Sequence, residues 1–281
     1  MGTPPDFVVV GHITLDTANG SALLGGAAYS ALAASRLGRR VGLFTSYGPD
    51  LKPGPDLDEV QVMARSTPRS TVFRNSYRAG RREQRVLSAS LPLNQAEIPP
   101  TWRQAAIVHL APMVGEVGPE FLEAFPGALM GASTQGWVRR IGPEGVVEPS
   151  PWAWSDQALS RLDAVIFSLE DVAGDEALIL RWAAQARCLV LTEGKRGAWV
   201  YCHGEKRHIK AFRVAKVVDP TGAGDVFASA FLVKWAEGMD PFQAAAFAGV
   251  AASFVVEHQG LAGVPTLAQL EEWWRRPKHD R

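Results

Sequence analysis

The chain has 281 residues, 47% of them hydrophobic and 21% charged, and its 29 lysines and arginines equal its 29 aspartates and glutamates. This ordinary globular composition leaves no basic footprint for nucleic acid, no apolar run long enough to span a membrane, and no signal-peptide pattern at the first residues. The only two cysteines, Cys188 and Cys202, are too few for a disulfide framework, so we expect a cytoplasmic protein with no nucleic-acid or membrane partner.

The first residues predict a strand, a helix and a second strand in succession. Phe7–Gly11 and Val41–Thr45 are short runs rich in β-branched and aromatic residues, which favour buried strands. Between them the alanine-rich stretch 27–37 predicts a helix that ends at Gly38. A strand–helix–strand opening favours a parallel sheet with helices on its faces.

A β-hairpin is predicted next, because residues 70–77 and 83–88 are strand-like runs on either side of a polar turn. The hairpin is rich in arginine, and charged side chains at a hairpin tip usually only contact solvent. The alternative is that one arginine reaches a phosphate or a substrate hydroxyl. The arginines in question are Arg74, Arg78, Arg81, Arg82 and Arg85.

The middle of the chain predicts further buried strands at 106–111, 128–133 and 162–168, and a strand–turn–strand unit at 189–201. His109 lies in the first of these strands. A lone strand histidine is more often a packed core residue, so it receives no catalytic role.

The most informative stretch is Lys216–Leu232. Its Val217–Val218 pair predicts the end of a strand, and Pro220 interrupts the ladder because proline has no N–H. The tight turn Gly222-Ala223-Gly224 follows, and then apolar residues recur every four positions, which predicts a helix.

A strand, a glycine turn and a helix start leave several backbone N–H groups unpaired at a positive dipole end, which predicts an anion site. Asp225 lies beside this predicted site, where two negative charges would repel. The arrangement is chemically sensible if the carboxylate meets a hydroxyl while the N–H groups hold a phosphoryl group, so that one attacks the other.

Two more helices are predicted after this stretch. Asp240 and Pro241 are an N-cap and a first-turn proline for a helix over 242–257. A capping-box pattern, Thr266 with Gln269, opens the last helix.

The string Asp219-Pro-Thr-Gly-Ala-Gly-Asp225 resembles the second signature of the ribokinase-like (PfkB) carbohydrate kinases. The pair Gly25-Gly26, followed by a small-residue helix ending in Leu37-Gly38, resembles the first. The resemblance covers nearly the whole chain. It implies a single α/β domain over residues 1–281, a doubly wound and mostly parallel sheet flanked by helices, with a small, reduced β lid near 12–24 and 68–90.

By this resemblance, Asp16 and the backbone of Gly25 and Gly26 hold hydroxyls of the phosphate acceptor. The chemistry is reasonable because a carboxylate can accept two hydrogen bonds from a vicinal diol. Ser30 would also face the acceptor, at a position where many members carry asparagine.

The resemblance also implies ATP and Mg²⁺. Asp225 would orient and deprotonate the acceptor hydroxyl, and the N–H groups of Gly222, Ala223 and Gly224 would stabilise the transferring phosphoryl group. The nucleotide would bind near Thr192, Gly194, Gly197, Thr221 and Gly249, the last on the small-residue helix where the family seats adenine.

Metal binding is implied at two places. The family carries Asn-x-x-Glu where this chain has Ser168 and Asp171, so Asp171, or Glu170 beside it, would organise Mg²⁺ largely through water. Asp219 would help to hold a monovalent cation such as K⁺.

Three functions remain open from the sequence. An ATP-dependent kinase for a sugar or polyol hydroxyl is favoured, and a nucleoside kinase of the same fold is the alternative, because a reduced lid would admit a larger acceptor. A catalytically silent sugar-binding or regulatory protein is allowed by Ser30, Ser168 and Asp171 but disfavoured by the intact Asp225 turn. A monomer and a homodimer are both compatible with the sequence.

Overall fold

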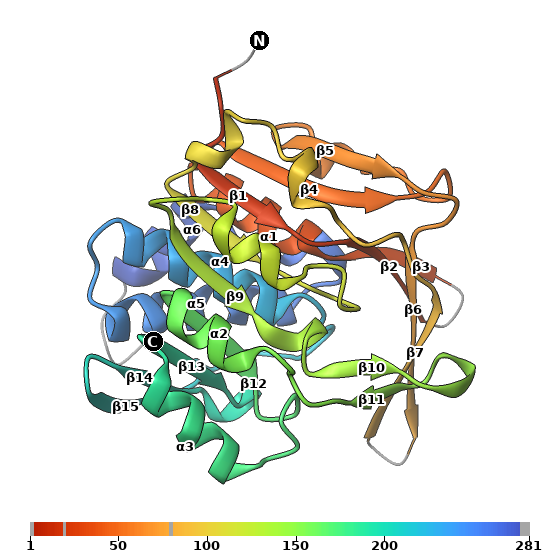
Figure 1. Ribbon diagram of the computed structural model, residues 1–281. Helices are drawn as coiled ribbons and strands as arrows, with labels where there is room; N and C mark the ends of the chain where they lie inside the picture. The colour runs from red at the N-terminus through yellow and green to blue at the C-terminus, as the bar shows by residue number, and fades with distance from the viewer. Residues whose placement is uncertain (1–2, 19–20, 79–80, 276–281) are drawn as a thin grey trace.

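A nine-stranded sheet forms the centre of the computed structural model, which describes residues 3–18, 21–78 and 81–275 (Figure 1). Its strands are β1 (Phe7–Val10), β4 (Val41–Tyr47), β5 (Gln61–Ser66), β8 (Ile107–Leu110), β9 (Leu129–Ser133), β12 (Ala164–Ser168), β13 (Cys188–Thr192), β14 (Ala198–Cys202) and β15 (Glu205–Ile209). The order is β15-β14-β13-β12-β9-β8-β1-β4-β5. All neighbours pair in parallel except β13 with β14 and β14 with β15.

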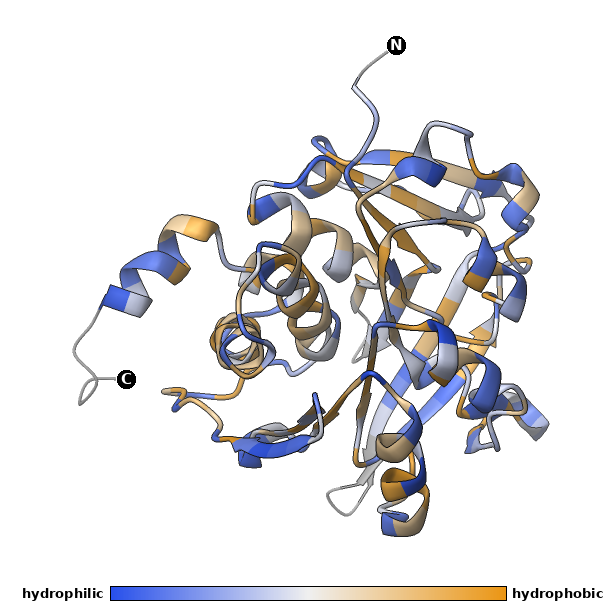
Figure 2. Cartoon of the chain, turned by 60° about the vertical axis from the view of Figure 1, so that its left-hand side comes forward, coloured by the Kyte–Doolittle hydropathy of each residue, from blue (hydrophilic) through white to orange (hydrophobic). Residues whose placement is uncertain are grey.

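Helices cover both faces of this sheet, which confirms the doubly wound α/β architecture expected from the sequence. One face carries α1 (Ala27–Arg36), α4 (Ala223–Ala236), α5 (Pro241–Val256) and α6 (Leu267–Arg275), and the other carries α2 (Ser155–Arg161) and α3 (Glu176–Gln185). Because side chains alternate along a strand, Val9 of β1 packs in the first core while Val8 and Val10 pack in the second. Figure 2 shows the apolar strands lying between the two helical layers.

Short 3₁₀ turns link many of these elements. They are Pro55–Leu57, Gln95–Glu97, Trp102–Gln104, Pro119–Glu123, Thr134–Gly136, Pro143–Gly145, Gly194–Arg196 and Gly260–Gly263. The two predicted helix starts are confirmed, since Asp240 accepts from the N–H of Phe242 and Thr266 exchanges hydrogen bonds with Gln269.

A second, four-stranded sheet, called here the small sheet, follows directly on β1. It contains β2 (Ile13–Ala18), β3 (Ser21–Gly26), β6 (Thr71–Arg78) and β7 (Arg81–Ser88) in the order β3-β2-β6-β7. The hairpin of β10 (Arg139–Ile141) and β11 (Val147–Pro149) reaches it in Figure 1, and a bridge joins Arg85 to Val146. The hairpin predicted at 70–88 is therefore confirmed. Strand β2, which carries Asp16, pairs with β3 and with β6 of this hairpin in the same sheet.

The strand end predicted at Val217–Val218 is wrong. The central sheet ends at β15, so these two residues have no strand to pair with, and their side chains are largely exposed. The N–H groups of Val218 and Asp219 instead donate to the carbonyl of Val256, at the end of α5. The segment is therefore anchored to a helix terminus.

Both cysteines are free and buried, directly opposite each other on β13 and β14. Within the described ranges, every helix is too short or too polar to cross a lipid bilayer.

Candidate active site

The turn before α4 needs glycine at Gly222. This residue has φ 79° and is the N-cap of α4, and a β-carbon there would overlap the ring of Tyr29. Ala223, Gly224 and Asp225 form the first turn, where backbone N–H groups have no helical acceptor. The N–H of Ala223 donates to the carbonyl of Pro220 at 3.3 Å, and anion binding at this positive helix end stays a prediction.

Asp225 lies at this helix end among charges from distant parts of the chain. Burial raises the pKa of its carboxyl to about 7; the charges of Asp16 and Asp171 raise that pKa too, whereas Arg139 lowers it. Charged groups from three segments, β2, the start of β10 and the turn after β12, thus act on the pKa of Asp225. A carboxylate that titrates near neutral pH is suited to accept a proton from a hydroxyl.

Asp16 on β2 is held in place by its neighbours. Thr14 donates a hydrogen bond of 3.2 Å from its hydroxyl to Asp16 Oδ1. A β-carbon on Gly25 would lie 2.6 Å from both Asp16 Oδ2 and Thr14 Oγ1, so glycine lets β3 approach this carboxylate closely. Gly26, at φ 60°, then starts α1.

Tyr29 is a site residue that the sequence reasoning missed. It is buried, and its burial together with the charges of Asp219, Asp16 and Asp225 raises the pKa of its phenol far above the ordinary value. Tyr29 is therefore a neutral hydroxyl among three carboxylates. Its position directly before Ser30, in the first signature, was the available signal.

Ser30, expected to face the acceptor, is completely buried in α1. Its hydroxyl has no hydrogen-bond partner within the described part of the chain. Tyr29 and Ser30 are both buried, so a contact between Ser30 and an acceptor stays a prediction.

The residues expected at the metal site form local turns. Asp171 Oδ2 accepts the N–H of Ser168 at 2.8 Å, and Ser168 Oγ accepts the N–H of Asp171 at 3.2 Å, while Glu170 is exposed. Asp219 Oδ1 similarly accepts the N–H of Thr221 at 2.9 Å. Among the described residues no three His, Cys, Asp or Glu side chains form a metal cluster, so Mg²⁺ here would also need phosphate and water oxygens.

The glycines expected to bind nucleotide have structural reasons to be glycine. Gly197 has φ 102°, and a β-carbon there would overlap the carbonyl of Ile209 on the neighbouring strand. A β-carbon on Gly249 would lie 3.2 Å from the Phe212 ring. Thr192 ends β13, and Gly194 begins the following 3₁₀ turn. Nucleotide binding by these residues remains a prediction.

The arginines of the β6–β7 hairpin do not gather at the site in the part that the structure describes. Arg74 is exposed, and Arg85 forms ion pairs with Glu83 and Glu144. The side chains of Arg78, Arg81 and Arg82 lie outside the described part.

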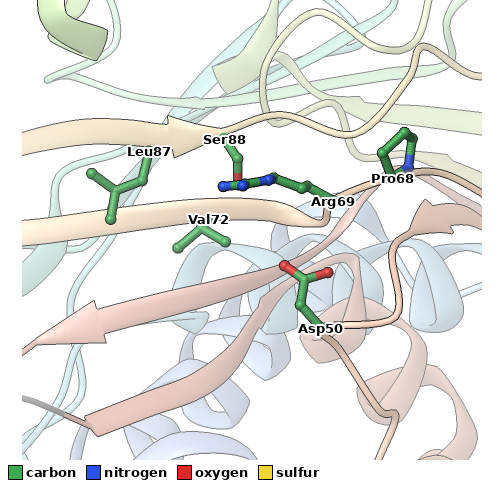
Figure 3. Close-up of a pocket in the computed structure, with 6 residues that line it drawn as sticks. All are labelled: Asp50, Pro68, Arg69, Val72, Leu87 and Ser88. Carbon is green, nitrogen blue, oxygen red and sulfur yellow. The ribbon is translucent and has the colours of Figure 1, made fainter.

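A cavity of about 400 Å³ opens on the face of β6–β7 opposite Phe73 (Figure 3). Asp50 there accepts hydrogen bonds from the N–H and hydroxyl of Ser70, which holds the start of the small sheet. This cavity is therefore separate from Asp225. Its lining is Asp50, Pro68, Arg69, Val72, Leu87 and Ser88.

Comparison with known proteins finds a matching family. The model of the pfkB family carbohydrate kinases matches residues 162–267, from β12 through the Asp225 turn to the start of α6. This part of the chain, which holds the Asp225 turn, is similar to that family, and the match spans less than half of the 281 residues. The enzyme class expected from the sequence, a phosphotransferase with a hydroxyl acceptor, is the class of the PfkB family and of its kinase-named relatives.

Two curated proteins similar to this chain are named as kinases of nucleosides. A cytidine kinase from Thermococcus kodakarensis is 25% identical over 83% of this chain and 89% of that enzyme. A nucleoside kinase from Methanocaldococcus jannaschii is 36% identical, but the alignment spans only 32% of this chain and 30% of that enzyme.

A solved structure shares this fold over nearly the whole chain. It is a pyrophosphate-dependent kinase in the ribokinase family, complexed with a pyrophosphate analog and myo-inositol. The TM-score is 0.77 at 22% identity, and the alignment covers 95% of this chain and 99% of that one.

Proposed function

We propose that this chain transfers the γ-phosphoryl group of ATP to a hydroxyl of a sugar or polyol. The observation that carries the proposal is the Asp225 carboxyl, with its pKa raised to about 7, at the open N-terminus of α4 and facing Asp16. An anion site, a base and a hydroxyl-binding carboxylate are the parts that phosphoryl transfer needs, because the reaction depends mainly on positioning and charge stabilisation.

In the proposed mechanism Asp16 orients the acceptor, and Asp225 accepts the proton of the attacking hydroxyl. The N–H groups of Gly222, Ala223 and Gly224 stabilise charge on the transferring phosphoryl group. Asp171 would support Mg²⁺ through water, and Asp219 would contribute to a K⁺ site. Mg²⁺ supplies charge neutralisation on the phosphates when it is bound.

The small sheet would act as the lid over the acceptor, which corresponds to residues 12–24 and 68–90 of one domain. We further propose a cytoplasmic protein, monomeric or homodimeric, that binds ATP and a small acceptor and has no nucleic-acid or membrane partner.

A nucleoside acceptor is the second candidate, favoured by the similarity to a cytidine kinase over most of both chains. The test is donor consumption with Mg²⁺ and K⁺ over a panel of sugars, inositols and nucleosides, with pyrophosphate as a second donor. We expect turnover with ATP on a sugar or polyol. Turnover only with pyrophosphate would contradict ATP as the donor, and absence of turnover on every acceptor would favour a silent binding protein.

Asp16→Ala is expected to weaken acceptor binding about ten- to a hundredfold, because hydrogen bonds to a charged group contribute roughly 1.5–3 kcal/mol. ATP binding should change much less, since Asp16 is proposed to contact the acceptor and not the nucleotide. Calorimetric titration of both ligands into the variant measures the difference. Equal weakening of both would show that Asp16 only supports the fold.

The acid limb of kcat/KM is expected near pH 7. The pKa of Asp225 is raised to about 7, so activity should fall as the pH drops through that value and the base becomes protonated. His109 does not account for this limb, because burial lowers its pKa to about 3. A pH–rate profile that stays flat down to pH 5 would contradict Asp225 as the base.

A further inference from the structure

Arg139, the first residue of β10, links three parts of the acceptor side. Its Nε and Nη2 donate hydrogen bonds of 3.0 and 2.7 Å to the carbonyl of Met113, and its Nη1 donates one of 2.8 Å to Gln84 Oε1 on β7. The guanidinium carbon lies 5.3 Å from the centre of the Phe73 ring on β6. One partly buried cation thus contacts both strands of the small-sheet hairpin.

The Met113 carbonyl is a fixed anchor for this arginine. The N–H of Met113 donates to both carboxylate oxygens of Glu116 at 2.9 Å, and Glu116 also accepts the N–H of His12 at 2.9 Å. Glu116 is almost completely buried. The Met113 peptide is therefore clamped between a carboxylate and a guanidinium.

The backbone that carries Arg139 is equally well held. Trp137, two residues earlier, donates a hydrogen bond of 2.7 Å from its indole to the carbonyl of Val117. Its ring stacks on Trp152 at 4.9 Å, inside the core beneath α2 and α3. Arg139 therefore extends from a rigid segment towards the small sheet.

The charge of Arg139 acts on Asp225 against several acidic groups. Asp16 on β2 and Asp171 after β12 raise the pKa of Asp225, and Arg139 opposes them. Tyr29 on α1 is held neutral by its raised pKa, and His109 on β8, hydrogen-bonded to Ser229 of α4, is held neutral by its lowered one.

We propose that Arg139 is a positioning residue of the kinase site, which ties the small sheet to the Met113 loop through its guanidinium and holds its charge within electrostatic range of Asp225. The inference rests on the proposed function, in which the small sheet covers the acceptor. It connects two features of the acceptor side. Arg139 holds the small sheet in place where the acceptor binds, and the same side chain favours the ionised form of Asp225.

The test compares Arg139→Gln with Arg139→Lys, and uses Arg140→Gln as the matched control. In Arg139→Gln the pKa of Asp225, read by carboxyl-carbon NMR with Asp225→Asn as the assignment standard, should rise by about 1 unit. The acid limb of kcat/KM should move by the same amount. Arg139→Lys keeps the positive charge but loses the planar guanidinium that donates hydrogen bonds to Met113 and Gln84. Its acid limb should therefore stay near the wild-type value while the acceptor KM rises about tenfold.

Arg140 carries the same charge one residue later, but it is exposed and pairs with Glu148. Arg140→Gln should therefore leave both the acid limb and the acceptor KM unchanged. Gln84→Ala removes only the contact with the small sheet, so it should raise the acceptor KM without moving the acid limb.

The outcomes separate this inference from the proposed function. Wild-type turnover combined with an unmoved Asp225 pKa in Arg139→Gln, or with an unchanged acceptor KM in Gln84→Ala, would overturn the inference and leave the kinase intact. Arg139→Lys with a strongly shifted acid limb would overturn it as well, and this variant serves if Arg139→Gln does not fold. A shifted pKa in a protein that phosphorylates no acceptor would instead refute the proposed function and keep the placement of Arg139.

Discussion

Asp225→Asn is expected to lower turnover at least about 100-fold, the lower end of the contribution of a general base. Asparagine keeps the shape of the side chain but removes its charge and basicity. ATP affinity should stay the same or rise, because one negative charge beside the phosphate site is lost. The measurement is steady-state turnover on a verified acceptor, together with calorimetric binding of ATP.

The direction of the stability change in Asp225→Asn follows from the pKa of Asp225. The pKa of Asp225 is raised from 3.8 to about 7 on folding, so the folded state loses stability as the pH rises from about 4 to about 7. Relative to the wild type, the variant should therefore gain stability progressively over this range, with the full gain above pH 7 and no gain below about pH 4. Turnover within a few-fold of wild type, in a variant whose melting curve shows it is folded, would refute the proposed mechanism.

Gly222→Ala is expected to be nearly as damaging for a different reason. A β-carbon at Gly222 overlaps the buried Tyr29 ring, and the φ of 79° is unfavourable for alanine. Overpacking of a tight core costs about 1–3 kcal/mol. Relief of the overlap should move the turn away from its anion-binding geometry, and loss of one such donor typically costs about 10²–10³-fold in turnover.

Gly238→Ala is the control for Gly222→Ala. Gly238 follows the other end of α4 with φ 88°, but a β-carbon added there would meet no other atom within 4 Å. Its replacement tests the cost of the left-handed backbone alone, so turnover should be unchanged and the melting temperature should fall slightly. Equal loss of turnover in both variants would show that the overlap with Tyr29 is not the cause.

The turn at Asp225 could be predicted from the sequence because its determinants are local. Glycine at Gly222, the helix periodicity after it and the caps at Asp240 and Thr266 each depend on residues a few positions apart. The strand at Val217–Val218 failed for the opposite reason. Its pairing depends on a distant sheet edge, and the carbonyl of Val256 receives its N–H groups instead.

Tyr29 and Arg139 could not be recognised from spacing. Tyr29 faces the site because α1 packs against α4 around Gly222, and Arg139 is brought there by the clustered tryptophans and by the Met113 loop. Ser30 can be proposed from its place in a motif, but its buried hydroxyl, which lacks a hydrogen-bond partner among the described residues, could not be foreseen from the sequence.

The segments that form the small sheet and the segment that carries the proposed base Asp225 are separate in the sequence. Asp16 and the Arg139 contacts lie on β2, β6, β7 and β10, whereas Asp225 and its glycine turn begin α4, almost 90 residues later. Substitutions that reshape acceptor choice can therefore accumulate in one set of segments while the transfer chemistry is inherited unchanged in the other. Such a division makes this fold tolerant of changes in substrate preference. A chimaera would test it, in which β2–β3, β6–β7 and the Arg139 segment are replaced together by those of another kinase of the same fold.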